Sequence, residues 1–231
     1  MKPNALKSPF SFAERRPLLS DGVFYVPEYY QDYAQFPFPA WDSCELFGNE
    51  HPVSLEFCSG NGDWIIEKAK SHPERNWVAI EIRFDRVRKI YAKRQILGLK
   101  NLLIVCGEGK TFSQWYLKDQ LVSESYINFP DPWPKKRHAK HRLLSPSFVA
   151  ELERILKEGG KAHFVSDDLR YMEESVALFE NSFLFTPRFP HPYYSTDSFC
   201  YGVCSWFETL WREKGREIRY AFFDRKGGAC P

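Results

Sequence analysis

The pattern of apolar and polar residues becomes regular after about residue 50. Short apolar segments predict strands at residues 53–57, 77–80, 102–105, 126–129 and 162–165. Between them, apolar residues at helical spacing predict helices at 63–70, 84–97 and 146–156, the last ended by Gly159 and Gly160. Repeated strand–helix units predict an α/β fold with a doubly wound, mostly parallel sheet.

The two ends of the chain depart from this alternation. Residues 217–223 predict a strand with no helix after it, so we expect this last strand to return antiparallel. Residues 1–50 mix aromatic and polar residues around several prolines without a sustained period. We therefore expect an irregular N-terminal extension over 1–50, packed on a single domain that spans 51–231.

Composition narrows the class of protein. A net charge of +2 is too small for a protein that coats nucleic acid, so any such binding must use a local patch. The six cysteines include no CxxC pair, which predicts reduced thiols and no metal site. No apolar run approaches the length of a membrane span, and the first residues lack the apolar segment of a secretory signal. We expect a cytoplasmic protein without a membrane partner, and the sequence does not specify its oligomeric state.

The most informative segment runs from Asn128 to Arg142. Asp131 lies between two prolines at the end of a predicted strand, so stiff backbone holds a carboxylate where open α/β sheets place their ligands. A basic run follows at once and suits phosphates. It consists of Lys135, Lys136, Arg137, His138, Lys140, His141 and Arg142. A solvated charged surface is the alternative interpretation of this run.

Acids and glycines at the ends of the earlier strands indicate a cofactor site. Gly60 and Gly62 allow a sharp turn after the first strand, although a structural turn alone could require them. Glu56 precedes this turn and favours a cation such as S-adenosylmethionine, which carries an ammonium and a sulfonium. Glu81 could accept from ribose hydroxyls or pair with a nearby arginine. Glu108 could contact adenine or belong to an ordinary polar loop.

The segment from Phe129 to Arg142 resembles the strongest signature of the bacterial tRNA (guanine-N7-)-methyltransferase family, which modifies guanosine 46 in the variable loop. The similarity runs from about Val53 to about Lys226, and the first fifty residues lie outside it. The resemblance implies a Rossmann-like class I methyltransferase fold, S-adenosylmethionine as cofactor and tRNA as substrate. It implies cofactor contacts at Glu56, Gly60, Gly62, Glu81, Glu108 and Asp131. It implies guanine or RNA contacts at Lys135, Asp167 and an element containing Ser205, Phe207 and Glu208.

Three positions depart from the family pattern. Cys58 stands where a loop glycine is expected, which requires a negative φ or some backbone strain. Glu108 replaces a more usual aspartate, and Trp206 replaces a usual lysine and so removes a cation. Cys58 and Trp206 are the features that favour a second interpretation, a non-catalytic RNA-binding protein on the same fold. A third interpretation keeps the cofactor but directs the methyl group to another RNA or to a small molecule.

The proposed chemistry needs no general base, because guanine N7 has a free lone pair. We expect Asp131 to be the catalytic residue, accepting from guanine while stabilising the positive charge that develops on the ring. Asp167 is a second candidate for the base edge, or else a helix N-cap, a role that Ser166 could also fill. Glu208 is either a base contact or a surface acid paired with Arg212. Trp133 is either an anchor of the loop or a stacking platform for a base.

Overall fold

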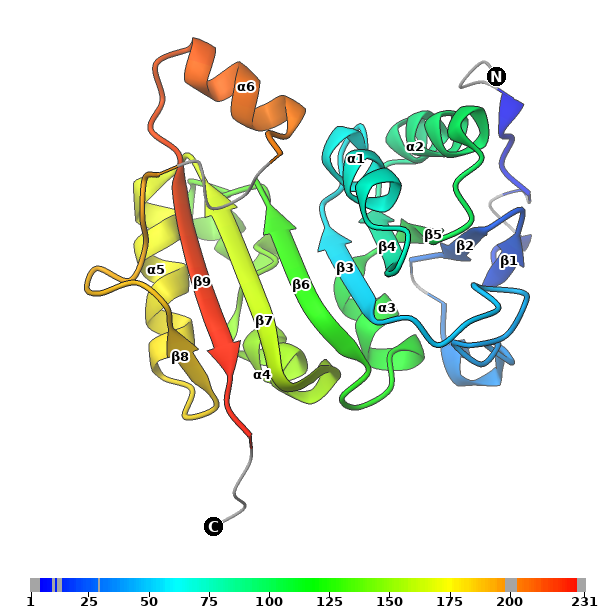
Figure 1. The fold of residues 1–231 in the computed structure, drawn as a ribbon, viewed down its shortest axis with the longest axis horizontal. Helices are drawn as coiled ribbons and strands as arrows, with labels where there is room; N and C mark the ends of the chain where they lie inside the picture. The colour runs from blue at the N-terminus through cyan, green and yellow to red at the C-terminus, as the bar shows by residue number, and fades with distance from the viewer. Residues whose placement is uncertain (1–4, 10, 12–13, 29, 198–202, 228–231) are drawn as a thin grey trace. The chain divides into compact units, whose positions relative to one another are not determined.

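The computed structural model describes residues 5–9, 11, 14–28, 30–197 and 203–227 (Figure 1). The chain divides into two compact units, Met1–Leu117 and Lys118–Pro231. The prediction of an α/β fold with mostly parallel strands and an antiparallel last strand is confirmed. Among the helices described, none is both long and apolar enough to cross a membrane.

The described part of the first unit contains five strands. Their order is β1 (Leu18–Ser20), β2 (Val23–Val26), β5 (Leu102–Gly107), β4 (Asn76–Glu81) and β3 (Val53–Phe57). The strands β2, β5, β4 and β3 pair in parallel and are almost wholly buried, which explains their continuous apolar sequences. The helices are α1 (Asp63–Ser71), α2 (Phe84–Leu97) and α3 (Gly109–Tyr116), with a short 3-10 helix η3 at Tyr33–Gln35.

Residues 18–26 correct the prediction of a wholly irregular N-terminal extension. They form an antiparallel hairpin whose second strand, β2, joins the sheet beside β5. Phe24 on β2 is fully buried and packs its ring against Phe38 at 4.9 Å and Tyr116 at 4.7 Å. The early aromatic residues are therefore part of the core of the first unit. The domain boundary at residue 50 stays a prediction.

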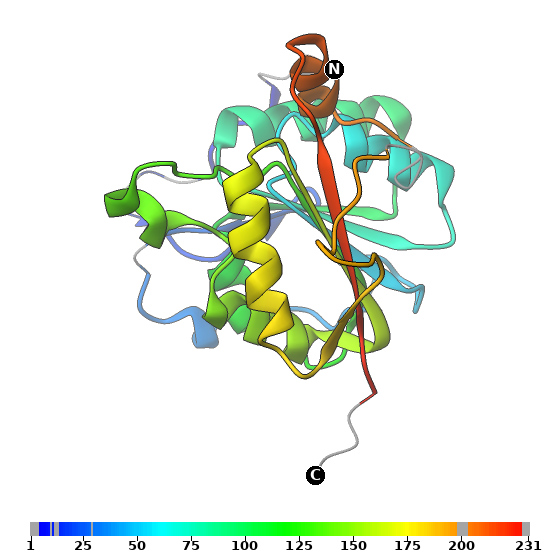
Figure 2. The ribbon, with the colours of Figure 1, turned by 90° about the vertical axis from the view of Figure 1, so that its left-hand side faces the viewer.

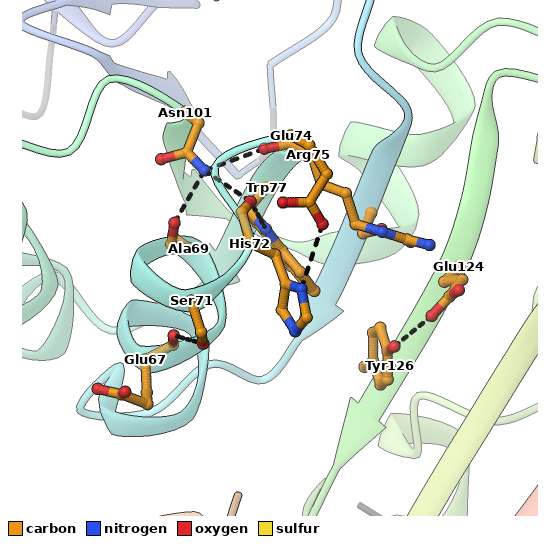
Figure 3. Close-up of polar contacts among 11 residues, drawn as sticks. Glu67, Ala69, Ser71, His72, Glu74, Arg75, Trp77, Asn101, Glu124 and Tyr126 are labelled. Carbon is orange, nitrogen blue, oxygen red and sulfur yellow. Dashed lines mark hydrogen bonds and ion pairs between the residues drawn. The ribbon is translucent and has the colours of Figure 1, made fainter. Parts of the chain in front are cut away.

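The end of α1 is fixed by one amide side chain. The Asn101 Nδ2 atom donates to the carbonyl oxygens of Ala69 at 2.9 Å, His72 at 3.2 Å and Arg75 at 3.0 Å (Figure 3). The indole N–H of Trp77 also donates to the His72 carbonyl, at 3.4 Å. Ala69 belongs to the last turn of α1, His72 is its C-cap and Arg75 follows the helix, so these bonds hold the link from α1 to β4.

In the second unit, the residues that the structure describes form four strands. Their order is β6 (Val122–Asn128), β7 (Leu156–Ser166), β9 (Arg219–Arg225) and β8 (Phe185–Pro187). β6 and β7 are parallel, whereas β9 is antiparallel to both β7 and β8. The helices are α4 (Pro146–Ile155), α5 (Leu169–Glu180) and α6 (Trp206–Glu213), and the 3-10 helix η4 covers Lys136–His141. α5 lies along β7, β9 and β8 (Figures 1 and 2), where Phe179 stacks on Phe223 at 4.1 Å.

The start of α4 follows its sequence signals, but its end does not. The Ser145 side chain accepts from the backbone N–H of Phe148, and Pro146 occupies the first turn, as expected for a helix start. The helix ends at Ile155, and β7 begins at the next residue. Gly159 and Gly160 therefore lie inside β7, near a register shift against β6, and do not end the helix.

Candidate functional site

The turn after β3 combines buried polar groups with left-handed backbone. Glu56 is only 2% exposed, near the end of the strand. Cys58, Gly60 and Gly62 have φ values of +62°, +57° and +78°. Two of these three positions are glycines that adopt such angles readily, whereas Cys58 does so at a steric cost. A negative φ or backbone strain was expected at Cys58, and its positive φ shows that the backbone is strained there.

Gly62 is required by packing as well as by its backbone angle. A Cβ atom at this position would lie 2.6 Å from Cγ1 of Ile90 on α2, too close for any side chain. Two lysines of α2 bind the residue before it: Lys93 Nζ donates to the Asn61 carbonyl at 2.8 Å, and Lys89 Nζ donates to Asn61 Oδ1 at 3.1 Å. The sequence did not reveal this role of the basic face of α2, which holds the turn in place.

Glu81 joins the end of β4 to the same turn. Its Oε2 atom accepts from the Gly60 backbone N–H at 2.8 Å, and its Oε1 atom accepts from the Arg83 backbone N–H at 2.8 Å. Burial raises the pKa of the Glu81 carboxyl above its ordinary value, against the opposing effects of these bonds and of Arg86 at 3.7 Å. Arg83 directs its own side chain to Asp85. Two residues predicted for the cofactor site are thus in direct contact.

Glu108 occupies a more exposed position. It is the residue before α3, and its Oε2 atom accepts from the Thr111 hydroxyl at 2.5 Å. A carboxylate at the start of a helix is favoured by the helix dipole. The polar loop expected at 107–109 is therefore a strand-to-helix junction with an acid at the surface.

Asp131 is exposed on the segment that follows β6. Its Oδ1 atom accepts from the Trp133 backbone N–H at 3.1 Å, and its second carboxylate oxygen has no partner within the part of the chain that the structure describes. Phe129 and Trp133 on either side have φ values of +48° and +42°. The Phe129 N–H donates to the Val165 carbonyl at 3.0 Å, which ties the start of the segment to β7. A carboxylate fixed by the bond from Trp133 is therefore presented to solvent.

The basic run continues into η4 and divides into two kinds of residue. Lys135, Arg137, Lys140 and His141 are exposed, and nothing is described for the side chain of Lys136. Arg142 is largely buried, with a side chain 13% exposed that pairs with Glu174.

Trp133 lies beside both histidines of the run. Its ring centroid is 5.7 Å from that of His138 and 5.3 Å from that of His141. Its side chain is half-buried, and its role as an anchor of the loop or as a stacking platform for a base stays a prediction.

Asp168, and not Asp167 or Ser166, is the N-cap of α5. Its side chain accepts from the Tyr171 backbone N–H at 2.8 Å. The Asp167 carboxylate instead pairs with Arg216 and is 11% exposed. The alternative of a capping role for Asp167 or Ser166 is therefore wrong, and the prediction that Asp167 contacts the base remains a prediction.

The Ser205–Glu208 element begins α6. The Ser205 hydroxyl accepts from the Glu208 backbone N–H at 3.1 Å. Glu208 is 1% exposed, and its Oε1 atom accepts from the Tyr220 hydroxyl and from Arg212 Nε at 3.2 Å. The expected pairing with Arg212 is confirmed, but Glu208 is not a surface acid. Its bond with Tyr220 on β9 holds the start of α6.

Phe207 connects this element to the segment of Asp131. Its ring centroid lies 6.4 Å from that of Phe129, two residues before Asp131. Trp206 is 48% exposed and packs edge-on against Phe207 at 5.0 Å. The structure therefore brings together two motifs that are far apart in the sequence.

The cysteines and acids show no metal site in the described part of the chain. Among the described cysteines, Cys44, Cys106 and Cys204 are free thiols, whereas Cys200 and Cys230 lie outside the described residues. No group of three or more His, Cys, Asp or Glu residues within the described ranges could hold a metal ion.

The sequence matches a known family over most of its length. A family model described as "Putative methyltransferase" matches residues 50–221. The chain is 44% identical over 228 residues to the tRNA (guanine-N(7)-)-methyltransferase of Chlamydia abortus and 47% identical over 228 residues to that of Chlamydia felis. These alignments cover 99% of this chain and 100% and 99% of the two relatives. The expectation that the first fifty residues lie outside the resemblance is therefore wrong.

Solved structures with the same architecture are methyltransferases. An rRNA methylase from Streptococcus thermophilus gives a TM-score of 0.52 at 10% identity, over 77% of this chain and 89% of that chain. The 16S rRNA methyltransferase KamB gives 0.52 at 16% identity, over 76% and 88%. At such identities the likeness concerns the fold alone, and it confirms the Rossmann-like class I methyltransferase fold.

Proposed function

The chain belongs to the tRNA (guanine-N7-)-methyltransferase family, and on this basis we propose that it methylates N7 of guanosine 46 in the variable loop of tRNA. The observation that carries the proposal is identity of 44–47% to curated members along their whole length. S-adenosylmethionine is the methyl donor and supplies an electrophilic methyl group when bound. We propose that the reaction takes place in the cytoplasm, where tRNA is found.

The first unit offers a donor set that fits this cofactor. Glu56 and Glu81 are buried acids beside a turn with left-handed backbone, and acids of this kind suit an ammonium group and ribose hydroxyls. Glu81 keeps lone pairs for such hydroxyls while it accepts from Gly60. Gly60 and Gly62 let the backbone come close to the cofactor in this proposal. The exposed Glu108 contacts the edge of the adenine ring. We also assign Asp131 to the cofactor side of the site.

Asp131 carries the chemistry that the protein must supply. Guanine N7 attacks through a lone pair in the plane of the ring, so no proton has to be removed. Positive charge then develops on the purine, and a fixed carboxylate that accepts from N1–H and the N2 amino group stabilises it. Two prolines and the bond from Trp133 hold Asp131 in place before the reaction. This lowers the free-energy cost of aligning the carboxylate with the guanine.

The second unit supplies the RNA contacts. We assign Lys135, which follows the motif and is exposed, to the guanosine or its phosphate. Further phosphates are assigned to Lys136, Arg137, His138, Lys140 and His141. Ser205 and Phe207 stand at the start of α6 near the same segment and are assigned to the substrate. Asp167 and Glu208 are assigned to this region as well, with their carboxylates already bound to arginines.

The test is direct. The purified protein is incubated with S-adenosylmethionine and unmodified tRNA, and the nucleosides are analysed by mass spectrometry after digestion. We expect 7-methylguanosine, and its loss when position 46 of the tRNA is changed to adenosine. Methylation that persists in that tRNA would redirect the activity to another site. Binding of tRNA without binding of S-adenosylmethionine in calorimetry would instead indicate a non-catalytic RNA-binding protein.

A further inference from the structure

Arg142 differs from Lys135, Arg137 and Lys140, which are exposed, because its side chain points back into the protein. Its Nε atom donates to the Pro132 carbonyl at 2.7 Å, and its Nη1 atom pairs with Glu174 on α5. The guanidinium also lies over the Tyr171 ring, 5.0 Å from the centroid. With 13% of its side chain exposed, Arg142 is poorly placed to reach a phosphate.

The partners of Arg142 form a rigid support. Tyr171 is 1% exposed in the first turn of α5, whose N-cap is Asp168. The Tyr171 hydroxyl accepts from the Leu144 backbone N–H at 3.3 Å, so the same ring also holds the chain just after Arg142. Arg170 pairs with Glu174 from the solvent side at 2.7 Å and leaves the Arg142 contact in place.

We propose that Arg142 is a positioning residue that fixes Asp131, and not a phosphate contact. The Arg142 clamp, formed by Arg142, Tyr171 and Glu174, holds the carbonyl of the residue directly after Asp131. This inference rests on the proposed function, because it assigns Arg142 a task in the methyl transfer.

The chemistry of arginine explains why this residue is needed. The guanidinium is a planar fork that donates in two directions at once, here to a carbonyl and to a carboxylate, while its face lies on an aromatic ring. A lysine keeps the charge but cannot make all three contacts. If the segment shifts by about 1 Å, turnover falls by up to roughly 100-fold.

The experiment compares three single variants, and the double variant of Arg142→Lys with Glu174→Gln, with the wild type. Arg142→Lys keeps the positive charge, and Glu174→Gln disturbs the clamp without removing a cation. Arg170→Lys is the matched control, since it alters the exposed partner of the same carboxylate and touches no part of the segment. For each protein, kcat and KM are measured with saturating S-adenosylmethionine, and tRNA affinity is measured at several salt concentrations. Limited trypsin digestion reports cleavage after Lys135 and Arg137.

The expected result is a fall in kcat of roughly 10- to 100-fold for Arg142→Lys, with unchanged salt dependence of tRNA binding and faster trypsin cleavage of the segment. Glu174→Gln changes kcat and cleavage in the same direction, the double variant loses no more than the stronger single one, and Arg170→Lys behaves as wild type. A normal kcat in both Arg142→Lys and Glu174→Gln would overturn the proposal, as would an equal loss in Arg170→Lys. If the wild type makes no 7-methylguanosine, the proposed function has failed, and the trypsin comparison still decides whether the clamp holds the segment.

Discussion

The Glu81 carboxylate accepts a hydrogen bond from the Gly60 backbone N–H at 2.8 Å, so an acid at the end of β4 braces the turn after β3. The two residues are 21 positions apart: Glu81 ends β4, and Gly60 lies in the turn that follows the neighbouring parallel strand β3. An acid expected to bind ribose or to pair with a nearby arginine therefore also shapes the turn after β3. Substitutions at Glu81 should change cofactor binding both directly and through the position of Gly60.

Replacing Glu81 by Gln should weaken S-adenosylmethionine binding by roughly 1.5–3 kcal/mol, the worth of hydrogen bonds to a charged acceptor. Burial raises the pKa of Glu81, so its carboxylate takes up a proton at a higher pH than usual on acidification. Wild-type affinity should therefore fall as the pH drops toward this raised pKa, and the variant should lack that dependence. Calorimetry over a pH series measures both effects. Glu67→Gln, which alters an exposed acid of α1, is the control and should bind as wild type.

Replacing Asp131 by Ala should lower turnover by about two orders of magnitude, as when a preorganised electrostatic partner is removed. Thermal stability and tRNA affinity should change little, because Asp131 is exposed and its one described bond joins it to Trp133. Single-turnover methylation and thermal unfolding, measured on the same preparation, check the two expectations. A normal turnover rate would make Asp131 a purely structural residue.

Replacing Arg137 and Lys140 together by Ala should flatten the salt dependence of tRNA binding. Both side chains are exposed. The slope of log affinity against log salt is negative, and each phosphate that the protein no longer neutralises reduces its magnitude by roughly 0.7–0.9. S-adenosylmethionine affinity should stay the same. Lys157→Ala removes an exposed cation from β7, outside the run, and serves as the control. An unaltered slope in the double variant would show that the run is a solvated surface.

His163 should make the protein sensitive to acid. It lies between Tyr126, stacked at 4.4 Å, and Phe222, and burial lowers its pKa from 6.5 to about 3 despite Glu124 at 3.8 Å. Lys161 and Arg188 act in the same direction as burial, and Asp224 opposes it. The unfolded chain therefore binds a proton between pH 6.5 and about 3 that the folded protein does not, so stability falls on acidification through this window.

The measurement for His163 is the free energy of unfolding as a function of pH. In that window His163 makes the free energy of unfolding fall by up to about 1.4 kcal/mol for each pH unit of acidification. His163→Phe keeps the aromatic packing and removes the titration, so its unfolding free energy should depend less steeply on pH. Equal slopes in both proteins would mean that His163 does not control acid stability.

The strands and helices with strong periodicity could be predicted from the sequence. The bounds of β3 and α2 agree to the residue, because β3 is a short buried apolar segment and α2 ends at Gly98, a left-handed C-cap. The sequence did not indicate β2 as a strand, since it is only four residues long and sits among aromatic residues without a period. Its pairing with β5, more than 70 residues away in the chain, is a tertiary contact that no local pattern contains.

The sequence predicted which residues form the candidate site, but not which side chains they contact. Asp131 and Lys135 are exposed, as residues that bind a substrate should be. Arg142 has the same charge as its neighbours in the basic run, and Glu208 is a lone acid after two aromatic residues, yet the structure buries them against Glu174 and Tyr220. Only the fold decides which members of a charged motif face solvent, because their partners come from α5 and β9.

The left-handed residues described above have a consequence for local stability. Phe129 and Trp133 enclose Asp131, and Cys58 opens the glycine turn, all three with positive φ. Strain of this kind costs of order 1–3 kcal/mol at each position and persists only where surrounding contacts enforce it. These short stretches should therefore open before the sheets that carry them, so their amide hydrogens should exchange first. Ligands that hold them closed would then slow this exchange without any change in the fold.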